Sequence, residues 1–130
     1  MWKPSPSGTF KINFDGTIFP AEKKSGIGVV IRDSRGLVIA SCSKVVYQVL
    51  GASEVENMAV TWALSFAADE GVNRAVLEGD SLDVSAGLRE DARFLSQQFD
   101  ELRYSHTKRE GNSLAHSLVR YAVGIPDFLV

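Results

Sequence analysis

The chain has 130 residues, of which 45% are hydrophobic, and this length and apolar content suit one globular domain with one core and exclude a second large domain. Its 14 basic and 16 acidic side chains give a net charge of −2, which excludes a global positive field that would attract a polyanion. The lone Cys42 excludes an internal disulfide, and the absence of a long apolar stretch argues against a membrane span.

The chain divides into an arm, a domain and a tail. Prolines break residues 1–8, which we expect to form an extended N-terminal arm. Residues 9–124 carry the periodic patterns of a folded domain, and residues 125–130 form a C-terminal tail. Because there is neither a signal peptide nor a membrane span, we expect an intracellular protein, cytoplasmic or nuclear, that is monomeric and makes no membrane contact.

The first half of the domain is predicted to be a meander of strands. From Thr9, apolar and polar residues alternate up to Asp15 and Gly16, which predicts a strand that ends there in a turn. Residues 26–32 and 37–46 are two further β-rich runs, and the Asp-Ser-Arg-Gly sequence between them favours a tight turn.

The second half alternates helices and strands. From Ser53, apolar residues recur at helical spacing up to Gly71, a residue type that commonly follows the last turn of a helix. The elements that follow are a strand, a helix, a strand and a helix, predicted at residues 74–79, at residues 81–98, at residues 101–108 and from Asn112 onward.

This order of elements restricts the topology of the sheet. Strands that are joined through a helix are usually parallel, whereas hairpin-connected strands are antiparallel, so the sheet is predicted to be mixed. Sites in such sheets gather at the carboxyl ends of the parallel strands. Asp15 and Asp80 both end predicted strands, which makes them candidates for a common site.

Each candidate acid also has a structural explanation. Asp15 before Gly16 is common turn chemistry, and Asp80 can likewise be a turn residue at a strand end. Ser53 and Glu56 have the spacing of a capping box, in which the glutamate accepts a hydrogen bond from the backbone at the start of the helix. Other acids, including Glu54 and Glu78, are interpreted as surface or ion-pairing residues.

Several segments in order resemble a known family. The segments FKINFDGT, GIGVVIRDSRG, ASEVENMAVTWALSFAADEG, LEGDSLDV and SHTKREGNSLAHSLVRYA are similar to plant ribonuclease H-like modules related to retrotransposon ribonuclease H. The resemblance extends from Trp2 to Tyr121. It implies a ribonuclease H-like α/β fold, with a five-stranded mixed sheet of order 3-2-1-4-5 flanked by helices.

The resemblance also implies a metal site and a reaction. Asp15, Glu56 and Asp80 match the acids that hold metal in the family, and His116 stands at the position of the fourth acid. The family uses two Mg²⁺ ions for phosphodiester hydrolysis, and an imidazole ligand makes Mn²⁺ an alternative. The implied activity is endonucleolytic hydrolysis of the RNA strand of an RNA–DNA hybrid, so a nucleic acid is the expected partner.

Further residues receive roles from the same resemblance. His106 matches a histidine that is thought to help release product in bacterial relatives, although a structural role for it is an open alternative. Candidates for contact with the substrate are Gly16, Ser53, Ser81, Lys108 and Arg109.

Two departures from the family pattern leave a second hypothesis open. The segment between the fourth and fifth strands is shorter than in the family and lacks a basic protrusion for the hybrid, and His116 replaces an acid. The alternative is therefore a catalytically weak or inactive module that serves as a nucleic-acid or protein binding domain.

Overall fold

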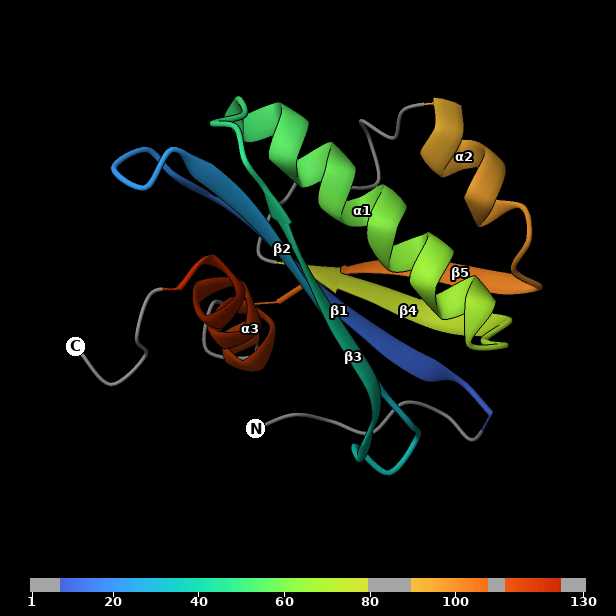
Figure 1. Cartoon of the computed structure of the whole chain (residues 1–130). Coiled ribbons are helices and arrows are strands. Elements are labelled where there is room, and N and C mark those ends of the chain that lie inside the picture. Colours follow the sequence, from blue (N-terminus) through green and yellow to red (C-terminus); the bar gives the residue numbers. More distant parts are fainter. Residues whose placement is uncertain (1–7, 80–89, 108–111, 125–130) are drawn as a thin grey trace.

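The computed structural model describes residues 8–79, 90–107 and 112–124. Its strands are β1 (Phe10–Phe19), β2 (Lys24–Arg32), β3 (Val38–Val46), β4 (Arg74–Gly79) and β5 (Glu101–His106). Its helices are α1 (Ala52–Asp69), α2 (Glu90–Ser96) and α3 (Ser113–Val123). The strands form one sheet in the order β3-β2-β1-β4-β5 (Figure 1), which confirms the predicted topology.

The directions of the strands are those of a mixed sheet. The hairpin-connected strands β1, β2 and β3 pair antiparallel, whereas β4 is parallel to both β1 and β5. In this register Asn13 of β1 lies between Val30 of β2 and Glu78 of β4. The central position of β1 makes its side chains accessible to helices on both faces of the sheet.

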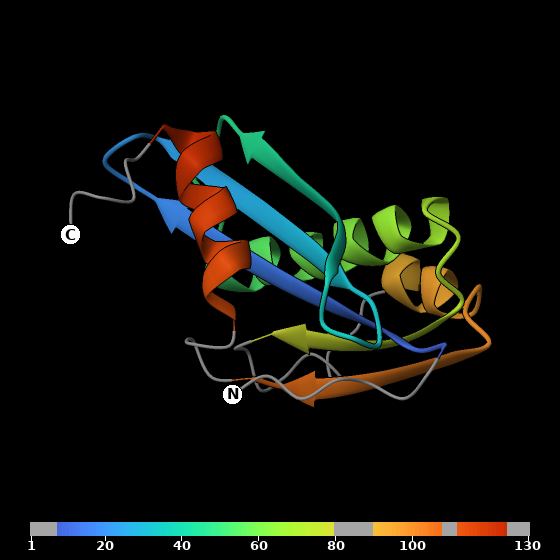
Figure 2. The ribbon, with the colours of Figure 1, turned by 90° about the horizontal axis from the view of Figure 1, so that it is seen from below.

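The helices cover the two faces of the sheet unequally. Helices α1 and α2 lie on one face and α3 on the other, as Figures 1 and 2 show. The larger core lies under α1 and includes Phe14, Ile12, Leu64 and Leu77, all buried. A smaller cluster of Phe19, Val119 and Val123 lies under α3.

The first strand is longer than predicted. Asp15 pairs with Gly28 of β2, and the pairing continues to Phe19, so the expected turn at Gly16 is wrong. Gly16 instead gives α1 room to approach the sheet. A Cβ atom at this position would lie 2.8 Å from the carbonyl oxygen of Val55, too close for any larger residue without a shift of the helix.

Helix α1 begins two residues earlier than the capping-box hypothesis requires. Its N-cap is Gly51, whose backbone N–H donates to Oε1 of Glu54 at 2.9 Å. The capping acid is therefore Glu54 and not Glu56, and Ser53 is an exposed residue inside the first turn. After the helix, Gly71 has a φ of 82°, a left-handed conformation that suits glycine and confirms the predicted stop.

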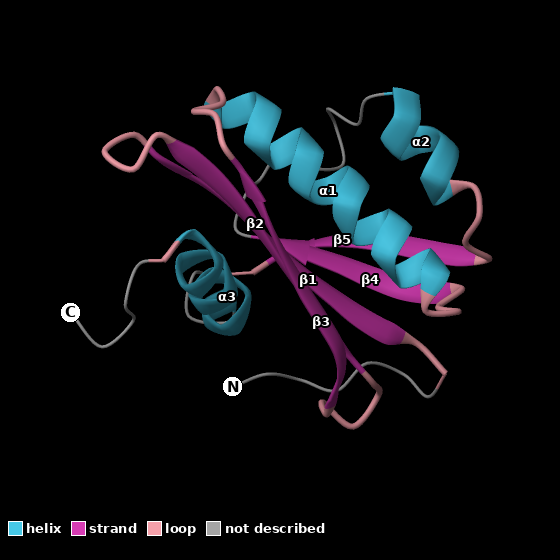
Figure 3. Cartoon of the chain, in the orientation of Figure 1, coloured by secondary structure: helices cyan, strands magenta, loops and turns pink. Residues whose placement is uncertain are grey.

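The connection between β4 and β5 contains α2, which Figure 3 shows beside α1. Residues 80–89, with the first part of the helix predicted at 81–98, lie outside the described residues. None of the helices in the described part of the chain is long and apolar enough to cross a membrane.

Candidate functional site

Asp15 is a buried acid on the central strand of the sheet. Its side chain is on the face that carries α3, because its neighbour Gly28 faces the backbone of that helix. Asp15 is only 5% exposed, and its Oδ2 accepts a hydrogen bond of 2.7 Å from the hydroxyl of Thr17, two residues along on the same face. The turn role that was the structural alternative for Asp15 is therefore wrong.

His116 contacts Asp15 from the opposite end of the sequence. Nδ1 of His116, on α3, lies 3.0 Å from Oδ2 of Asp15, although the two residues are 101 positions apart. The side chain of His116 is 27% exposed, so one edge of the pair is accessible to solvent while the carboxylate is buried. The structure thus brings together two of the four expected metal ligands.

Two features hold α3 close enough to β1 for this contact. The side chain of Asn112, at the start of α3, donates through Nδ2 to the carbonyl oxygen of Phe14 at 2.7 Å. The carbonyl of Ala115 lies over Gly28, where a Cβ atom would be only 2.2 Å from that oxygen. Asn112 was predicted as a helix cap, and it does occupy the N-cap position, but its side chain makes no capping hydrogen bond.

Glu56 is on the first part of α1, at the other side of β1. The contact between Gly16 and Val55 places this turn of the helix over the residue that follows Asp15. Glu56 is half-buried and its Oε2 atom is buried. Because Glu54 makes the capping hydrogen bond, the capping role that competed with a site role for Glu56 is wrong.

The other predicted site residues lie elsewhere or outside the described residues. His106 is exposed at the end of β5, where it pairs in register with Gly79. Ser53 is exposed on α1, and its carbonyl accepts a hydrogen bond from Asn57. The residues that lie outside the described part of the chain are Asp80, Ser81, Lys108 and Arg109.

Sequence reasoning missed a buried polar cluster beside Asp15. Glu78 of β4 accepts a hydrogen bond from Asn13 Nδ2 at 3.1 Å and pairs with Nζ of Lys11 at 3.4 Å. Lys11, Asn13 and Asp15 alternate along β1 and so share one face of the sheet. That alternation was visible in the sequence, but the partner on β4 was not.

The donors at this site suit a divalent cation in kind. Carboxylate oxygens are ligands for Mg²⁺, and a carboxylate with an imidazole nitrogen suits Mn²⁺. The buried Asp15 carboxylate beside His116 supplies both donor types. Within the described ranges no group of three or more His, Cys, Asp or Glu side chains is arranged to hold a metal, and Asp80 lies outside those ranges.

The sheet order, the helices on both faces and the acid on the central strand define a ribonuclease H-like α/β domain. A model of the reverse transcriptase-like family matches residues 13–122. The chain therefore belongs to the reverse transcriptase-like family.

Solved structures with the same fold come from several sources. The chain is similar to RNase H1 of the halophilic archaeon Halobacterium salinarum, with 25% identity, a TM-score of 0.79, and coverage of 88% of this chain and 97% of that one. An N-terminal RNase H domain from Mycobacterium tuberculosis has 21% identity, a TM-score of 0.76, and coverage of 88% and 93%.

A third similar structure is LC11-RNase H1 in complex with an RNA/DNA hybrid. It has 21% identity, a TM-score of 0.72, and coverage of 88% of this chain and 96% of that one. No curated protein sequence matches the chain.

Proposed function

We propose that this protein is a metal-dependent endonuclease that hydrolyses the RNA strand of RNA–DNA hybrids. The observation that carries the proposal is the contact between Asp15, on the central strand of a ribonuclease H-like sheet, and His116 of α3. The similarity to RNase H1 structures, one of them bound to a hybrid, supports nucleic acid as the partner. The protein acts as a monomer in this proposal.

The ligands of the metal in this proposal are Asp15, Glu56, Asp80 and His116. Two bound Mg²⁺ or Mn²⁺ ions would supply a water of lowered pKa and would stabilise the leaving oxygen of the phosphodiester. The chain itself contributes a fixed position for the first acid. The hydroxyl of Thr17 and the ring of His116 both contact Oδ2 of Asp15, which restricts the rotation of the carboxylate.

Selectivity for RNA would come from contacts to the 2′-hydroxyl groups in the shallow minor groove of the hybrid. Gly16, Ser53, Ser81, Lys108 and Arg109 are the candidates for substrate contact in this proposal. His106 is exposed at the end of β5, a position that suits transient contact with a released product better than a metal ligand.

The proposal is tested by incubating the purified protein with a labelled hybrid, with single-stranded RNA and with duplex DNA. Each substrate is offered Mg²⁺ and, separately, Mn²⁺. We expect cleavage of the RNA in the hybrid alone and only with metal present. Cleavage of single-stranded RNA in a chelator would indicate a contaminating nuclease.

A second candidate function is a catalytically weak or inactive binding module, retained from a plant retroelement. The observation that favours it is that Nδ1 of His116 already contacts Asp15, so that only Nε2 of the ring could bind a metal, whereas an acid at this position would offer two oxygens. A protein that binds the hybrid with either metal but leaves it intact would support this function over hydrolysis.

A further inference from the structure

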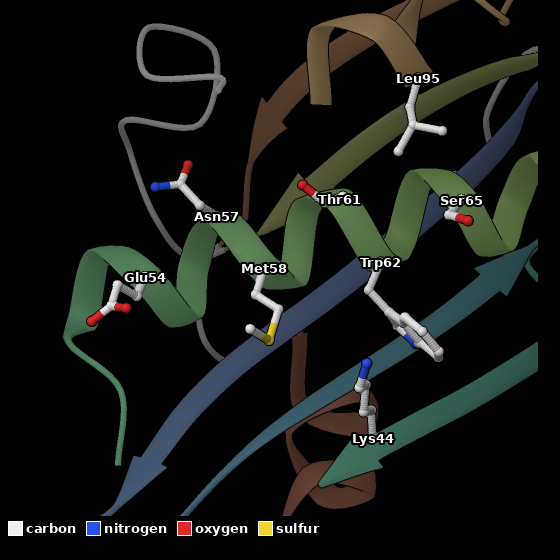
Figure 4. Close-up of a pocket in the computed structure, with 8 residues that line it drawn as sticks. All are labelled: Lys44, Glu54, Asn57, Met58, Thr61, Trp62, Ser65 and Leu95. Atoms are coloured by element: carbon white, nitrogen blue, oxygen red, sulfur yellow. The ribbon is translucent and has the colours of Figure 1, made fainter. Parts of the chain in front are cut away.

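A groove of about 370 Å³ crosses α1 at a distance from the candidate site. Figure 4 shows Lys44 of β3 and Leu95 of α2 on either side of the helix, with Glu54 toward one end of the groove and Ser65 toward the other. None of Asp15, Glu56 and His116 lines it. Its volume is in the range of pockets that hold small organic groups.

One side of the groove offers neutral hydrogen-bonding groups in a row. Asn57, Thr61 and Ser65 line it, and their spacing of four residues places them above one another on the same side of α1 (Figure 4). An amide and two hydroxyl groups can both donate and accept hydrogen bonds. This side of the groove therefore suits a ligand that carries both hydrogen-bond donors and acceptors, and its neutral groups favour neither a cation nor an anion.

The other side offers an aromatic ring held in a fixed orientation. The indole N–H of Trp62 donates to Sγ of Cys42 on β3 at 3.2 Å, and Met58 precedes Trp62 by one turn. Burial raises the pKa of the Cys42 thiol, so this partner of the indole is uncharged at neutral pH. An aromatic ring that is already oriented loses little conformational freedom when a ligand stacks on it.

A positive charge lies over the face of this ring. Nζ of Lys44 is 4.5 Å from the centre of the Trp62 ring. Lys44 is exposed, so its ammonium group can leave the ring when a ligand stacks there and can pair with an anionic group of that ligand. The acid of the groove, Glu54, is in the first turn of α1, about two turns before Trp62, and accepts a hydrogen bond from the backbone N–H of Gly51. The charged group that contacts the aromatic ring is therefore Lys44.

We propose that this groove binds single-stranded nucleic acid, with a nucleobase stacked on Trp62 and its phosphate on Lys44. Proteins that hold single strands without sequence preference combine aromatic platforms with nearby cations, and each stacked base adds substantially to binding. The base edge would meet the row of Asn57, Thr61 and Ser65. A neutral peptide would contact the apolar groups equally well, but it would provide no anion for Lys44.

This inference goes beyond the proposed hydrolysis, because it concerns a surface that needs neither metal nor cleavage. It is tested in a Trp2→Phe background, in which Trp62 is the remaining tryptophan. A short thymidine oligonucleotide is added in the presence of a chelator, and the tryptophan emission is followed. We expect saturable quenching, whereas emission that stays unchanged at saturating oligonucleotide would overturn the proposal.

Matched variants locate the binding. By anisotropy of a labelled oligonucleotide, Trp62→Leu should weaken binding about tenfold and Lys44→Met about fivefold. Lys24→Met is the control, because Lys24 lies over Tyr47 at 5.5 Å in a similar pair outside the groove. We expect this control to bind as wild type does.

Equal losses in Lys44→Met and Lys24→Met would indicate nonspecific charge attraction and overturn the proposal. If an apolar anilinonaphthalene dye binds the groove and the oligonucleotide does not displace it, the groove is an apolar surface that nucleic acid does not occupy, and the proposal is overturned. Hybrid cleavage that continues in a protein whose groove binds no oligonucleotide would overturn this inference alone and leave the proposed hydrolysis intact.

Discussion

Asp15 is buried and already has two hydrogen-bonding partners, and these partners determine which of its oxygens could bind a metal. The hydroxyl of Thr17 and the imidazole of His116 both contact Oδ2, so Oδ1 is the oxygen that these contacts leave for other ligands. A histidine beside the carboxylate also avoids the repulsion that a second acid would cause without metal. If residue 116 is the fourth ligand, as we propose, we expect its histidine to make the metal-free site more stable than an acid would.

Replacement of His116 by an acid should make the metal-free site less stable and the metal-bound site more stable. We predict that His116→Asp lowers the free energy of unfolding by about 1–3 kcal/mol without metal, because two carboxylates then face each other. Mg²⁺ should restore much of this loss and should raise Mg²⁺-dependent cleavage above the wild-type rate. Urea denaturation with and without Mg²⁺, beside a cleavage assay, measures both effects. Wild-type cleavage that His116→Ala leaves unchanged would contradict a ligand role for His116.

The neighbouring acids Glu54 and Glu56 are expected to have different roles, Glu54 in the stability of α1 and Glu56 in cleavage. We predict that Glu54→Gln lowers stability by about 0.5–1 kcal/mol, since it weakens the hydrogen bond to Gly51, and that it leaves hybrid cleavage near the wild-type rate. Glu56→Gln should abolish cleavage. Thermal unfolding and cleavage of both variants test the assignment, and loss of cleavage in Glu54→Gln alone would reverse it.

At the scale of elements, the position of α3 on the sheet decides whether His116 can meet Asp15. Asn112 joins the first turn of α3 to the backbone of Phe14, the residue before Asp15. Gly28 has no side chain to keep the carbonyl of Ala115 away from β2. Both contacts are on the same face as Asp15, so they align α3 and the acid together.

Removal of the Asn112 side chain should therefore be costly. We predict that Asn112→Ala lowers the free energy of unfolding by about 1–3 kcal/mol, because the buried carbonyl of Phe14 loses its donor. The control is Asn57→Ala, whose Nδ2 donates to the carbonyl of Ser53 within α1, at an exposed position, and which should cost less than about 0.5 kcal/mol. Urea denaturation measures the free energy of unfolding of both variants. Equal losses would show that the hydrogen bond from Asn112 to Phe14 contributes no more to stability than the exposed bond of Asn57.

Most of the elements could be predicted from the sequence because their patterns are local. The β-rich run in β2, the alternation in β5 and the helical spacing in α1 each extend over enough residues to identify the element. The end of β1 was missed because Asp15 and Gly16 form a typical turn pair. Gly16 is retained in the strand by a tertiary contact with Val55, which no local pattern reveals.

The candidate site was harder to predict for the same reason. Asp15 and His116 are 101 residues apart, and only the resemblance to a family placed them in one ligand set. The pairing of Asn13 and Glu78 spans 65 residues and was not predicted, since the sequence indicated only a surface or ion-pairing role for Glu78 and named no partner. Contacts between distant residues depend on sheet register, which a single sequence determines poorly.

At the scale of the whole molecule, the net charge of −2 limits how the protein can hold a polyanion. We predict that hybrid affinity falls only shallowly with salt, because the slope of log K against log salt is about −0.9 for each phosphate contact and few such contacts are available. Anisotropy of a labelled hybrid across a range of salt concentrations measures this slope. A steep slope, typical of about 6–10 contacts, would show a basic surface that the charge balance does not suggest.

The measurement that tests the central claim most directly is cleavage of a labelled RNA–DNA hybrid by the wild type, by Asp15→Asn and by Asp80→Asn. Each variant removes the charge of one proposed metal ligand while it nearly conserves side-chain volume, so the fold should persist, which circular dichroism can check. We predict that the wild type cleaves the RNA strand with Mg²⁺ or Mn²⁺ and that both variants lose this activity by several orders of magnitude. Cleavage by Asp15→Asn at the wild-type rate would contradict the account.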